Sequence, residues 1–380
     1  MISFEMTNEQ RQMQDVARKF TRNQIIPAAS ELDEKAQMPI DIINDAFKFG
    51  LWNLNLPEKY GGMGLDHLTE AILLEEIAYG CLGVCGAWAG NSLGLTPILL
   101  AGTDEQKDRW LYKFGEEPIF AAFCITEANA GSDVAAVRTQ ARRAGDEYVL
   151  NGVKHFITHG GIAQMHTVFA RTGEPNSGTK GLSAFIIPQN TPGLSMGKLE
   201  NKMGDRASHI SEVIFEDVRV PVVDRLGDEG QGFKIAMQTL DRTRMCIGAA
   251  AVGVARRAYE EALEYSKQRV QFGKPLCKHQ AIAFMLADMA TEIEAARGLV
   301  WHAAWRMDSG DADPKLGAMA KLYAADAAMK ITVDALQIFG GYGYMKEYPM
   351  EKLMRDAKIL QIYEGTQQIQ RMVISSRIMN

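Results

Sequence analysis

The spacing of apolar residues changes twice along this 380-residue chain, and that change limits the folds it can adopt. In the N-terminal third the spacing is helical. Thr7 and Gln10 form a capping box, and the first helix is expected to end at Pro27. Near Pro118 the pattern changes to short β-rich segments bounded by Gly, Asn, Ser or Pro, which favours an antiparallel sheet or barrel. These segments are IFAAFCIT, EYVLNGVKHFIT, HTVFARTG, GLSAFIIP and SEVIFEDVRVP.

The helical spacing returns after GDEGQGFK and continues to the C-terminus. In the long stretch from His279, apolar residues form one stripe, which is typical of a bundle helix with its methionines in the core. The stripe contains Ile282, Met285, Leu286, Met289, Ile293, Ala296, Val300 and Ala304. We therefore predict a mainly α protein with a central β domain. Its three parts are an N-terminal helical domain at 1–117, a central β domain at 118–228 and a C-terminal helical bundle domain at 229–380.

Charge and cysteine usage narrow the class of protein. A net charge of −6 without a basic stripe argues against a nucleic-acid partner. The five cysteines fit neither a zinc pattern nor a disulfide framework, and are typical of buried thiols in a reducing compartment. The N-terminal residues have the features of neither a signal nor a transit peptide, and no stretch approaches the ~18 consecutive apolar residues of a membrane span. We expect a cytoplasmic protein with no membrane insertion.

Two short patterns suggest chemistry that their surroundings do not favour. GNSLG matches the G-x-S-x-G elbow of serine hydrolases around Ser92, but the residues before it are helical and no strand precedes it. His155 and His159 are four apart, as in a metal-binding helix. In the strand expected there, however, their side chains would lie about 13 Å apart, and no Cys or Asp completes a metal shell. We expect no metal site.

Phosphate-binding signatures are also missing, although two loops could approach a ligand. No G-x-G-x-x-G follows a strand and opens a helix, and no Walker A sequence is present. FGGYG at 339–343 could be a helix C-cap and turn or a close backbone approach to a ligand. TEANAGSD at 126–133 could be an ordinary turn, or a tight loop whose N–H groups and hydroxyls hold phosphates or a polar ring edge.

One acid near the C-terminus has unusual surroundings. In LMRDAKILQIYEGTQQIQRMV, Glu364 lies between a tyrosine and a glycine, and Asp356 is the only other carboxylate from Leu353 onward. Surface helices usually carry several acids paired with bases at i,i+4 spacing. A lone acid before Gly-Thr instead indicates a helix that is interrupted so that a single carboxylate points to a particular place.

Eight stretches of this sequence, taken together, resemble the acyl-CoA dehydrogenase family of flavoenzymes. They occur in the family's order along essentially the whole chain, and YEGTQQIQR with LDRTR is most similar to the short- and medium-chain members. The stretches are CITEANAGSD, NGVKHFITHGG, KMGDRAS, VIFEDVRVP, QRVQFGKPL, QIFGGYGY, YPMEKLMRDAKI and QIYEGTQQIQR. The resemblance implies the family's fold, with a middle β-barrel or sandwich and a C-terminal four-helix bundle that builds a homotetramer. It also implies FAD between the β domain and the bundle, reaching partly into a neighbouring subunit.

The resemblance assigns roles residue by residue. Glu364 corresponds to the catalytic base, and Thr158 to a hydroxyl close to flavin N5. Phe156 stands where many relatives have tryptophan. The full cofactor-binding set is Phe123, Ile125, Thr126, Gly131, Ser132, Phe156, Ile157, Thr158, Arg269, Phe272, Gln280, Gln337, Gly340, Gly341, Thr366 and Gln368. The substrate-binding set is Ser132, Asp241, Arg244, Tyr363 and Gly365.

The assignment of Glu364 as a base gives the lone carboxylate a chemical role. Oxidising a saturated acyl-CoA thioester requires removal of a weakly acidic α-proton while a hydride leaves the β-carbon, and a desolvated, aimed carboxylate with a matched pKa can take that proton. Some relatives carry the base near the position of Thr243, where threonine cannot serve. The resemblance implies electron-transferring flavoprotein as the electron acceptor.

Other functions on the same sequence stay open. Within flavoenzymes these are an acyl-CoA oxidase, an enoyl-CoA reductase and a specialist for cyclic acyl-CoA. From other classes they are a flavin-free scaffold and a serine hydrolase at Ser92. CLGVCGAWAGNSLGL at 81–95 aligns with the closed end of the family's acyl pocket, where Trp88 either packs in the core or forms a wall that favours a short or broad acyl group. No arginine in this stretch pairs with a second carboxylate, which disfavours dicarboxylic acyl-CoA.

Overall fold

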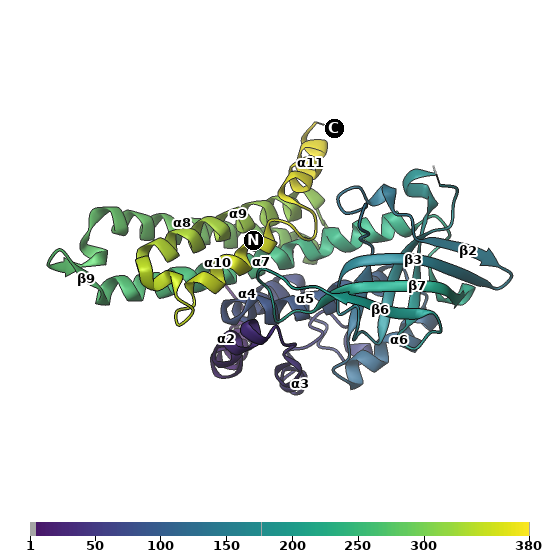
Figure 1. Cartoon of the computed structure of the whole chain (residues 1–380), viewed down its shortest axis with the longest axis horizontal. Coiled ribbons are helices and arrows are strands. Elements are labelled where there is room, and N and C mark those ends of the chain that lie inside the picture. The colour runs from purple at the N-terminus through teal and green to yellow at the C-terminus, as the bar shows by residue number, and fades with distance from the viewer. Residues whose placement is uncertain (1–4, 176, 380) are drawn as a thin grey trace.

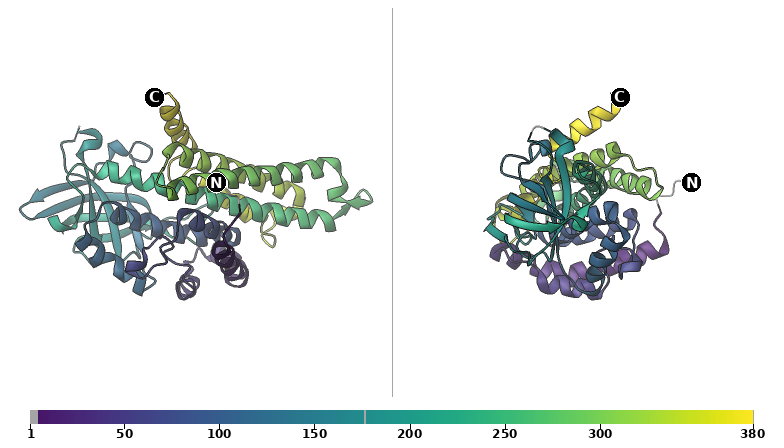
Figure 2. Two further views of the ribbon diagram at one scale, coloured as in Figure 1. Left: turned by 180° about the vertical axis from the view of Figure 1, so that it is seen from behind. Right: turned by 90° about the vertical axis from the view of Figure 1, so that its right-hand side faces the viewer.

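Helices lie on one side of a central β sheet and extend away from it as a long bundle (Figure 1). The computed structural model describes residues 5–175 and 177–379. Figure 2 shows from behind and end-on that the sheet occupies one end of the molecule, while the bundle reaches the other end. The expected mainly α fold with a central β domain is confirmed. The domain boundaries near residues 118 and 228 stay a prediction.

Within residues 5–117, six α-helices form the N-terminal part. They are α1 (Asn8–Phe20), α2 (Ile26–Lys35), α3 (Ile40–Lys48), α4 (His67–Gly80), α5 (Leu82–Ala101) and α6 (Asp104–Glu116). The capping box of Thr7 and Gln10 is present at the start of α1. The expectation that this helix ends at Pro27 is wrong, because a π-helical turn at Thr21–Ile25 leads directly into α2. Pro27 is the second residue of α2 and follows this turn directly, so it does not end the helical run.

The central sheet has eight strands. They are β1 (Ala121–Cys124), β2 (Gln140–Ala144), β3 (Glu147–Thr158), β4 (Met165–Arg171), β5 (Leu182–Pro188), β6 (Leu194–Leu199), β7 (Ile210–Pro221) and β8 (Arg225–Leu226). Their order is β6-β7-β3-β2-β4-β5-β8, with β1 paired to β4. The expected antiparallel pairing holds for most neighbours, but β1 runs parallel to β4, with Ala121 opposite Met165. A single residue pair of β2 and β4 is also parallel. The chain from β1 to β4 passes through β2 and β3, so this connection is long enough for parallel pairing.

The C-terminal part is a bundle followed by a projecting helix. Its helices are α7 (Gly232–Gln268), α8 (Gln280–Asp308), α9 (Pro314–Phe339), α10 (Met350–Leu360) and α11 (Gln367–Ile378). α7 contacts α8, α9 and α10 within the bundle, and also α4 and α5 of the N-terminal part. A small hairpin of β9 (Val270–Gln271) and β10 (Lys274–Pro275) connects α7 to α8 at the far end from the sheet (Figure 1). In the apolar stripe predicted on α8, the residues from Leu286 to Ala304 are buried, whereas Ile282 and Met285 are half-buried.

Helix α5 joins the parts of the molecule because it packs on both the sheet and the bundle. In the described ranges it is the helix whose length and hydropathy would suit a membrane span, yet two-thirds (67%) of its apolar window is buried inside the fold, as in a core helix. Two glycines permit its close approach to the sheet. A Cβ at Gly90 would lie 2.5 Å from Thr158 Cγ2, and one at Gly94 would lie 2.7 Å from Ala121 Cβ. Larger residues at these positions would push α5 away from Thr158.

Candidate active site

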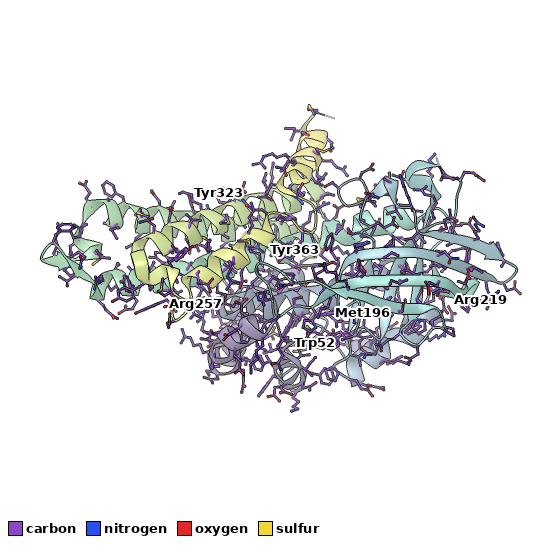
Figure 3. All side chains as sticks on the ribbon, viewed as in Figure 1. Trp52, Met196, Arg219, Arg257, Tyr323 and Tyr363 are labelled. Atoms are coloured by element: carbon purple, nitrogen blue, oxygen red, sulfur yellow. The ribbon has the colours of Figure 1, made fainter. Side chains whose placement is uncertain are left out.

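Glu364 lies in the break between α10 and α11, which is the interruption that its sequence context predicts. Both Glu364 and Gly365 have left-handed backbone conformations, with φ of +51° and +92°. This conformation is strained for a glutamate and typically costs about 1 kcal/mol or more, so the surrounding contacts must hold it. Figure 3 shows the neighbouring Tyr363 near the middle of the molecule, where the bundle meets the sheet.

Two side chains from the bundle fix this turn. Lys321 of α9 is fully buried, and its Nζ donates to the carbonyl of Gly365 at 2.8 Å and to Gln367 Oε1 at 3.2 Å. The amide Nε2 of Gln370 donates to the carbonyl oxygens of Glu364 and Gly365 at 3.1 and 2.9 Å. Burial lowers the pKa of Lys321 to about 8, although the nearby Glu364 and Asp326 carboxylates act in the opposite direction. The turn therefore depends on a buried ammonium group.

Helix α10 is also anchored just before the turn. Asp356 is buried, and its Oδ1 accepts the backbone N–H of Asp205 at 2.7 Å. Its other oxygen pairs with Lys352 Nζ at 2.5 Å. Arg355 adds an ion pair to Asp33 of α2 at 2.7 Å. These contacts tie α10 to the loop before β7 and to the N-terminal helices, which fixes where the Glu364 turn begins.

The Glu364 carboxyl lies in surroundings that favour its neutral form. Burial raises its pKa from 4.5 to about 7, and this effect outweighs the hydrogen bond from Thr243 and the charges of Arg244 and Lys321, which lower it. Thr243 Oγ1 donates to Glu364 Oε2 at 2.7 Å. A carboxyl with a pKa near 7 is partly ionised at neutral pH and can both accept and return a proton.

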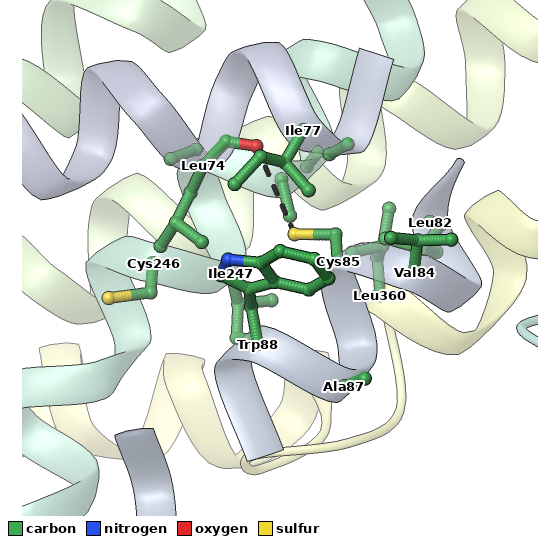
Figure 4. Packing of buried hydrophobic residues seen from close by; sticks show 14 of the residues in the cluster. Leu74, Ile77, Leu82, Val84, Cys85, Ala87, Trp88, Cys246, Ile247 and Leu360 are labelled. Carbon is green, nitrogen blue, oxygen red and sulfur yellow. Dashed lines mark hydrogen bonds between the residues drawn. The ribbon is translucent and has the colours of Figure 1, made fainter. Parts of the chain in front are cut away.

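A narrow, partly open cavity lies against this carboxyl, between α4, α5 and α7. Its lining residues are Asn53, Leu54, Glu70, Leu74, Trp88, Ala89, Ser92, Thr243, Cys246 and Glu364. Figure 4 shows the Trp88 indole between the helices, near Leu74 and Cys246. Trp88 is also a core residue, because its Nε1 donates to the Leu51 carbonyl and its ring packs edge-on against Trp52 at 5.0 Å. The two roles considered for Trp88 are therefore compatible.

The expected substrate-binding residues divide between this site and the surface. Asp241 and Arg244 flank Thr243 on α7 and form an ion pair with each other. Tyr363 and Gly365 adjoin Glu364 in the turn. Ser132 instead lies exposed in the loop after β1 and does not line the cavity.

The expected flavin-ring residues form one group beside β1 and β3. The backbone N–H of His155 donates to the Thr126 carbonyl at 2.8 Å, which brings the two segments side by side. The side chain of Phe156 is 58% exposed, and its backbone is left-handed with φ of +58°. Phe123, Ile125 and Ile157 are buried in the core, so a ligand on this surface would meet mainly their backbone. Thr158 is partly exposed at the end of β3, and Gly131 and Ser132 are exposed in the adjacent loop.

The expected nucleotide-binding residues form a second group at the far end of the bundle. Arg269, Gly340 and Gly341 line one cavity there, together with Tyr265, Gln271, Leu276, Ile338, Phe339, Tyr342 and Met345. The Arg269 guanidinium lies 5.7 Å from the centre of the Tyr342 ring, and Phe272 is 95% exposed. Gln280 and Gln337 are exposed nearby on α8 and α9. Within one chain this group lies at the opposite end of the molecule from the sheet (Figure 1). Thr366 caps α11, and Gln368 is exposed.

The structure does not support a serine hydrolase site at Ser92 or a metal site at His155 and His159. Ser92 lies within α5 rather than at a strand-to-helix elbow, and its hydroxyl is 3.3 Å from Glu70 Oε1. His159 is buried with Nδ1 3.1 Å from the Ala121 carbonyl, and His155 faces Glu212. Throughout residues 5–175 and 177–379, no group of three or more metal-ligating side chains is present.

Lys321, Gln370 and Glu70 are site residues that the sequence did not reveal. Lys321 carries the clearest signal, because it is a single lysine among alanines on the buried face of α9. Glu70 belongs to a helix that is buried on nearly all sides, so no apolar stripe marks its position as unusual.

Comparison with known proteins agrees with this architecture. Family models match residues 7–117 (acyl-CoA dehydrogenase, N-terminal domain), 122–218 (middle domain) and 230–379 (C-terminal domain). The short-chain specific acyl-CoA dehydrogenase of Clostridium acetobutylicum is 44% identical, covering 99% of this chain and all of that protein. Butyryl-CoA dehydrogenase from Megasphaera elsdenii shares the fold at a TM-score of 0.97 and 44% identity, with both chains fully covered. A chain in a structure of the electron transferring flavoprotein of Acidaminococcus fermentans matches at a TM-score of 0.97 and 45% identity, also with full coverage of both.

The fold and these matches define an oxidoreductase that acts on acyl-CoA. The chain belongs to the acyl-CoA dehydrogenase family, whose members are flavoproteins. The resemblance stated from the sequence is thereby confirmed.

Proposed function

We propose that this protein is an FAD-dependent dehydrogenase of short or compact acyl-CoA thioesters, with Glu364 as the base that removes the α-proton. The observation that carries the proposal is the Glu364 carboxyl at the wall of a narrow cavity, with a pKa of about 7. A base with this pKa is ionised often enough to act at neutral pH and still binds the proton well. Its left-handed turn, braced by Lys321 and Gln370, keeps the carboxyl oriented.

The same turn offers a donor for the thioester carbonyl. The backbone N–H of Glu364 has no hydrogen-bond acceptor within the described part of the chain. A preorganised N–H that meets the thioester oxygen stabilises the negative charge developing there when the α-proton leaves, and one such donor is typically worth about 3 kcal/mol. Glu364 would then supply both the base and a donor that acidifies the substrate.

The residues assigned to FAD fit a flat ring and a phosphate group at two separate places. Phe156 exposes an aromatic face beside Thr158, as a ring-binding surface would. Open space surrounds the Cα atoms of Gly131, Gly340 and Gly341, so a ligand can approach their backbone closely. Arg269 beside the last two glycines suits a phosphate. Bound FAD would supply the acceptor for the β-hydride.

The separation of these two groups supports an oligomer in which each FAD contacts two subunits, as in the homotetramer that the family resemblance implies. One chain holds the ring-binding and the phosphate-binding residues at opposite ends, so neighbouring chains are needed to combine them. We propose electron-transferring flavoprotein as the electron acceptor, a choice supported by the Acidaminococcus fermentans structure. A soluble, cytoplasmic enzyme is consistent with this acceptor.

The cavity supports a short or broad acyl group. Trp88 closes part of its wall, and no arginine or lysine is among its lining residues in the described ranges. A long chain would meet the indole, and a second carboxylate would be buried without a partner.

The test is anaerobic mixing of the purified flavoprotein with a panel of thioesters while the flavin absorbance is followed. The panel comprises butyryl-, hexanoyl-, palmitoyl-, glutaryl- and cyclohexenylcarbonyl-CoA. We expect bleaching with the highest kcat/KM for a short or cyclic substrate. Best activity on palmitoyl- or glutaryl-CoA would refute the pocket interpretation but not the dehydrogenase class. A colourless protein, or free CoA released without bleaching, would refute the proposed function, and oxidation only of the reduced flavin by enoyl-CoA would indicate the reductase direction.

A further inference from the structure

A second carboxyl group lines the cavity that contains the Glu364 carboxyl. Glu70 of α4 is 4% exposed, and its side chain forms part of the cavity wall. Ser92 Oγ of α5 donates to Glu70 Oε1 at 3.3 Å, a long hydrogen bond. Cys246 of α7 lines the same cavity, and its thiol interacts electrostatically with both Glu70 and Glu364. The acyl cavity thus has one carboxyl assigned to proton transfer and one without an assigned role.

No cation neutralises Glu70 by an ion pair among the described residues. The charge of His67, one helical turn earlier, acts to lower the pKa of Glu70, and the His67 ring pairs with Asp308 at 2.7 Å. Burial raises the pKa of Glu70, and this effect exceeds the opposing influences of His67, Ser92 and Cys246. A neutral carboxyl has one O–H donor and free acceptor positions, so it can hydrogen-bond to an uncharged polar group.

Apart from Glu364, Glu70 is the main polar group of the cavity wall that can still bind a substituent of the substrate, because the other polar lining residues already have hydrogen-bond partners. Asn53 donates to the Phe114 carbonyl at 2.8 Å and accepts from Asn91, so its amide is already occupied. The hydroxyls of Ser92 and Thr243 are directed to Glu70 and Glu364. The remaining lining residues are Leu54, Leu74, Trp88, Ala89 and Cys246.

An unsubstituted alkyl chain would be a poor complement to this wall. Filling the cavity with methylene groups would displace solvent from Glu70 and provide no hydrogen bond in return, which is unfavourable for a buried polar group. A carboxylate substituent would find no cation, and an ammonium substituent would place a second charged group in a largely apolar cavity. A hydroxyl group satisfies the carboxyl without introducing a charge.

We propose that Glu70 is a specificity-determining residue, and that the preferred substrates are acyl-CoA thioesters with a hydroxyl group beyond the β-carbon. This inference rests on the proposed function, because it assumes that the cavity next to Glu364 receives the acyl group. We place the hydroxyl beyond the reacting α- and β-carbons, at C4 or C5, because Glu70 of α4 and Glu364, in the turn between α10 and α11, line the same short cavity. Glu70 contacts the substrate substituent and takes no part in proton abstraction.

The experiment compares matched substrates with the FAD-loaded enzyme. The pairs are butyryl- with 4-hydroxybutyryl-CoA and pentanoyl- with 5-hydroxypentanoyl-CoA, each used fresh because hydroxyacyl thioesters can cyclise. We expect the wild-type kcat/KM to favour at least one hydroxylated member by roughly tenfold, as one satisfied buried hydrogen bond allows. Glu70→Leu should reverse this preference. Glu70→Gln should preserve its direction, because the amide keeps both a donor and an acceptor.

Leu74→Met is the matched control, since it changes the shape of the same wall without its polarity. It should alter both members of a pair by similar factors. A wild-type preference for the unsubstituted member of both pairs would overturn the proposal while the dehydrogenase assignment stands. So would a Glu70→Leu enzyme that loses activity equally on both members, since that is the result of a structural role. If Glu70→Leu fails to retain flavin, the substrate preferences of the wild-type enzyme and of Glu70→Gln test the proposal instead. No bleaching with any thioester would overturn the proposed function and this inference together.

Discussion

The hydroxyl of Thr243 on α7 donates a hydrogen bond to Oε2 of Glu364 across 2.7 Å, joining residues 121 positions apart in the sequence. This bond favours the ionised carboxylate, and burial favours the neutral acid. The balance gives Glu364 a pKa of about 7. The threonine that cannot act as a base therefore has a defined position beside the residue that we propose as the base.

The activity of the wild-type enzyme should rise with pH through about 7, because the free enzyme must carry an ionised Glu364. Thr243→Val removes the donor with little change in shape and should move the midpoint of the kcat/KM–pH profile upward by about one unit. Thr239→Val is the control one turn earlier on α7, because the Thr239 hydroxyl donates to the Ile235 carbonyl and does not contact Glu364. A Thr243→Val profile that coincides with that of wild type would show that this bond does not tune the base.

Replacing the acid should also change how stability depends on pH. Between pH 4.5 and about 7 the folded chain retains a proton on Glu364 that the unfolded chain has lost, so the free energy of unfolding falls as pH rises through this window. Glu364→Gln is uncharged throughout and should be more stable than wild type at pH 8, by up to about 3 kcal/mol. The advantage should disappear near pH 4.5. Denaturant unfolding at both pH values is the measurement, and a variant less stable at pH 8 would contradict the raised pKa.

Lys321→Met should weaken the turn that presents the base. The variant removes the hydrogen bonds to the Gly365 carbonyl and to Gln367 Oε1, and it removes a positive charge that lowers the pKa of Glu364. We expect a lower kcat and a pH midpoint shifted upward. Lys330→Met on the same helix is the control, since Lys330 makes an exposed ion pair with Glu292. Equal effects of the two substitutions would indicate general destabilisation of α9 instead.

Arg269→Ala should release FAD more readily and loosen the oligomer, because we assign this arginine to the cofactor phosphates at a subunit contact. Charge-assisted contacts of this kind are roughly twice as strong as neutral hydrogen bonds. Lys267→Ala, which removes a nearby exposed partner of Glu264, is the control. Flavin content and elution volume in gel filtration are the readouts. Unchanged flavin content in Arg269→Ala would count against the assignment.

The sequence predicts the order of the parts and the interrupted helix at Glu364 because both depend on local signals. Apolar spacing and turn residues identify the helices and most strands, and Glu-Gly-Thr marks the break. Pro27 shows the limit of such signals, since tertiary packing supports a π-helical turn that lets the chain remain helical. The parallel pairing of β1 with β4 also depends on contacts distant in sequence.

The cavity is not predictable from local sequence signals, because its walls come from segments that are far apart in the chain. Glu70 belongs to α4, Ser92 to α5 and Glu364 to the turn between α10 and α11, and no local pattern predicts that they border one space. Lys321 is recognisable only as a charge on an otherwise apolar face, which does not reveal that it braces the Gly365 carbonyl. The family resemblance identifies the proposed base from the sequence. The residues that position this base are identified only from the three-dimensional structure.

The most direct test of the central claim is anaerobic mixing of the Glu364→Gln flavoprotein with butyryl-CoA or the best thioester found. The amide is nearly isosteric, so the variant should retain FAD and bind the thioester, seen as a perturbed flavin spectrum or by calorimetry. It cannot accept the α-proton, so we predict that the rate of bleaching falls by a factor of about a thousand or more, within the range that general base catalysis contributes. Bleaching that retains more than a few per cent of the wild-type rate would show that Glu364 is not the base.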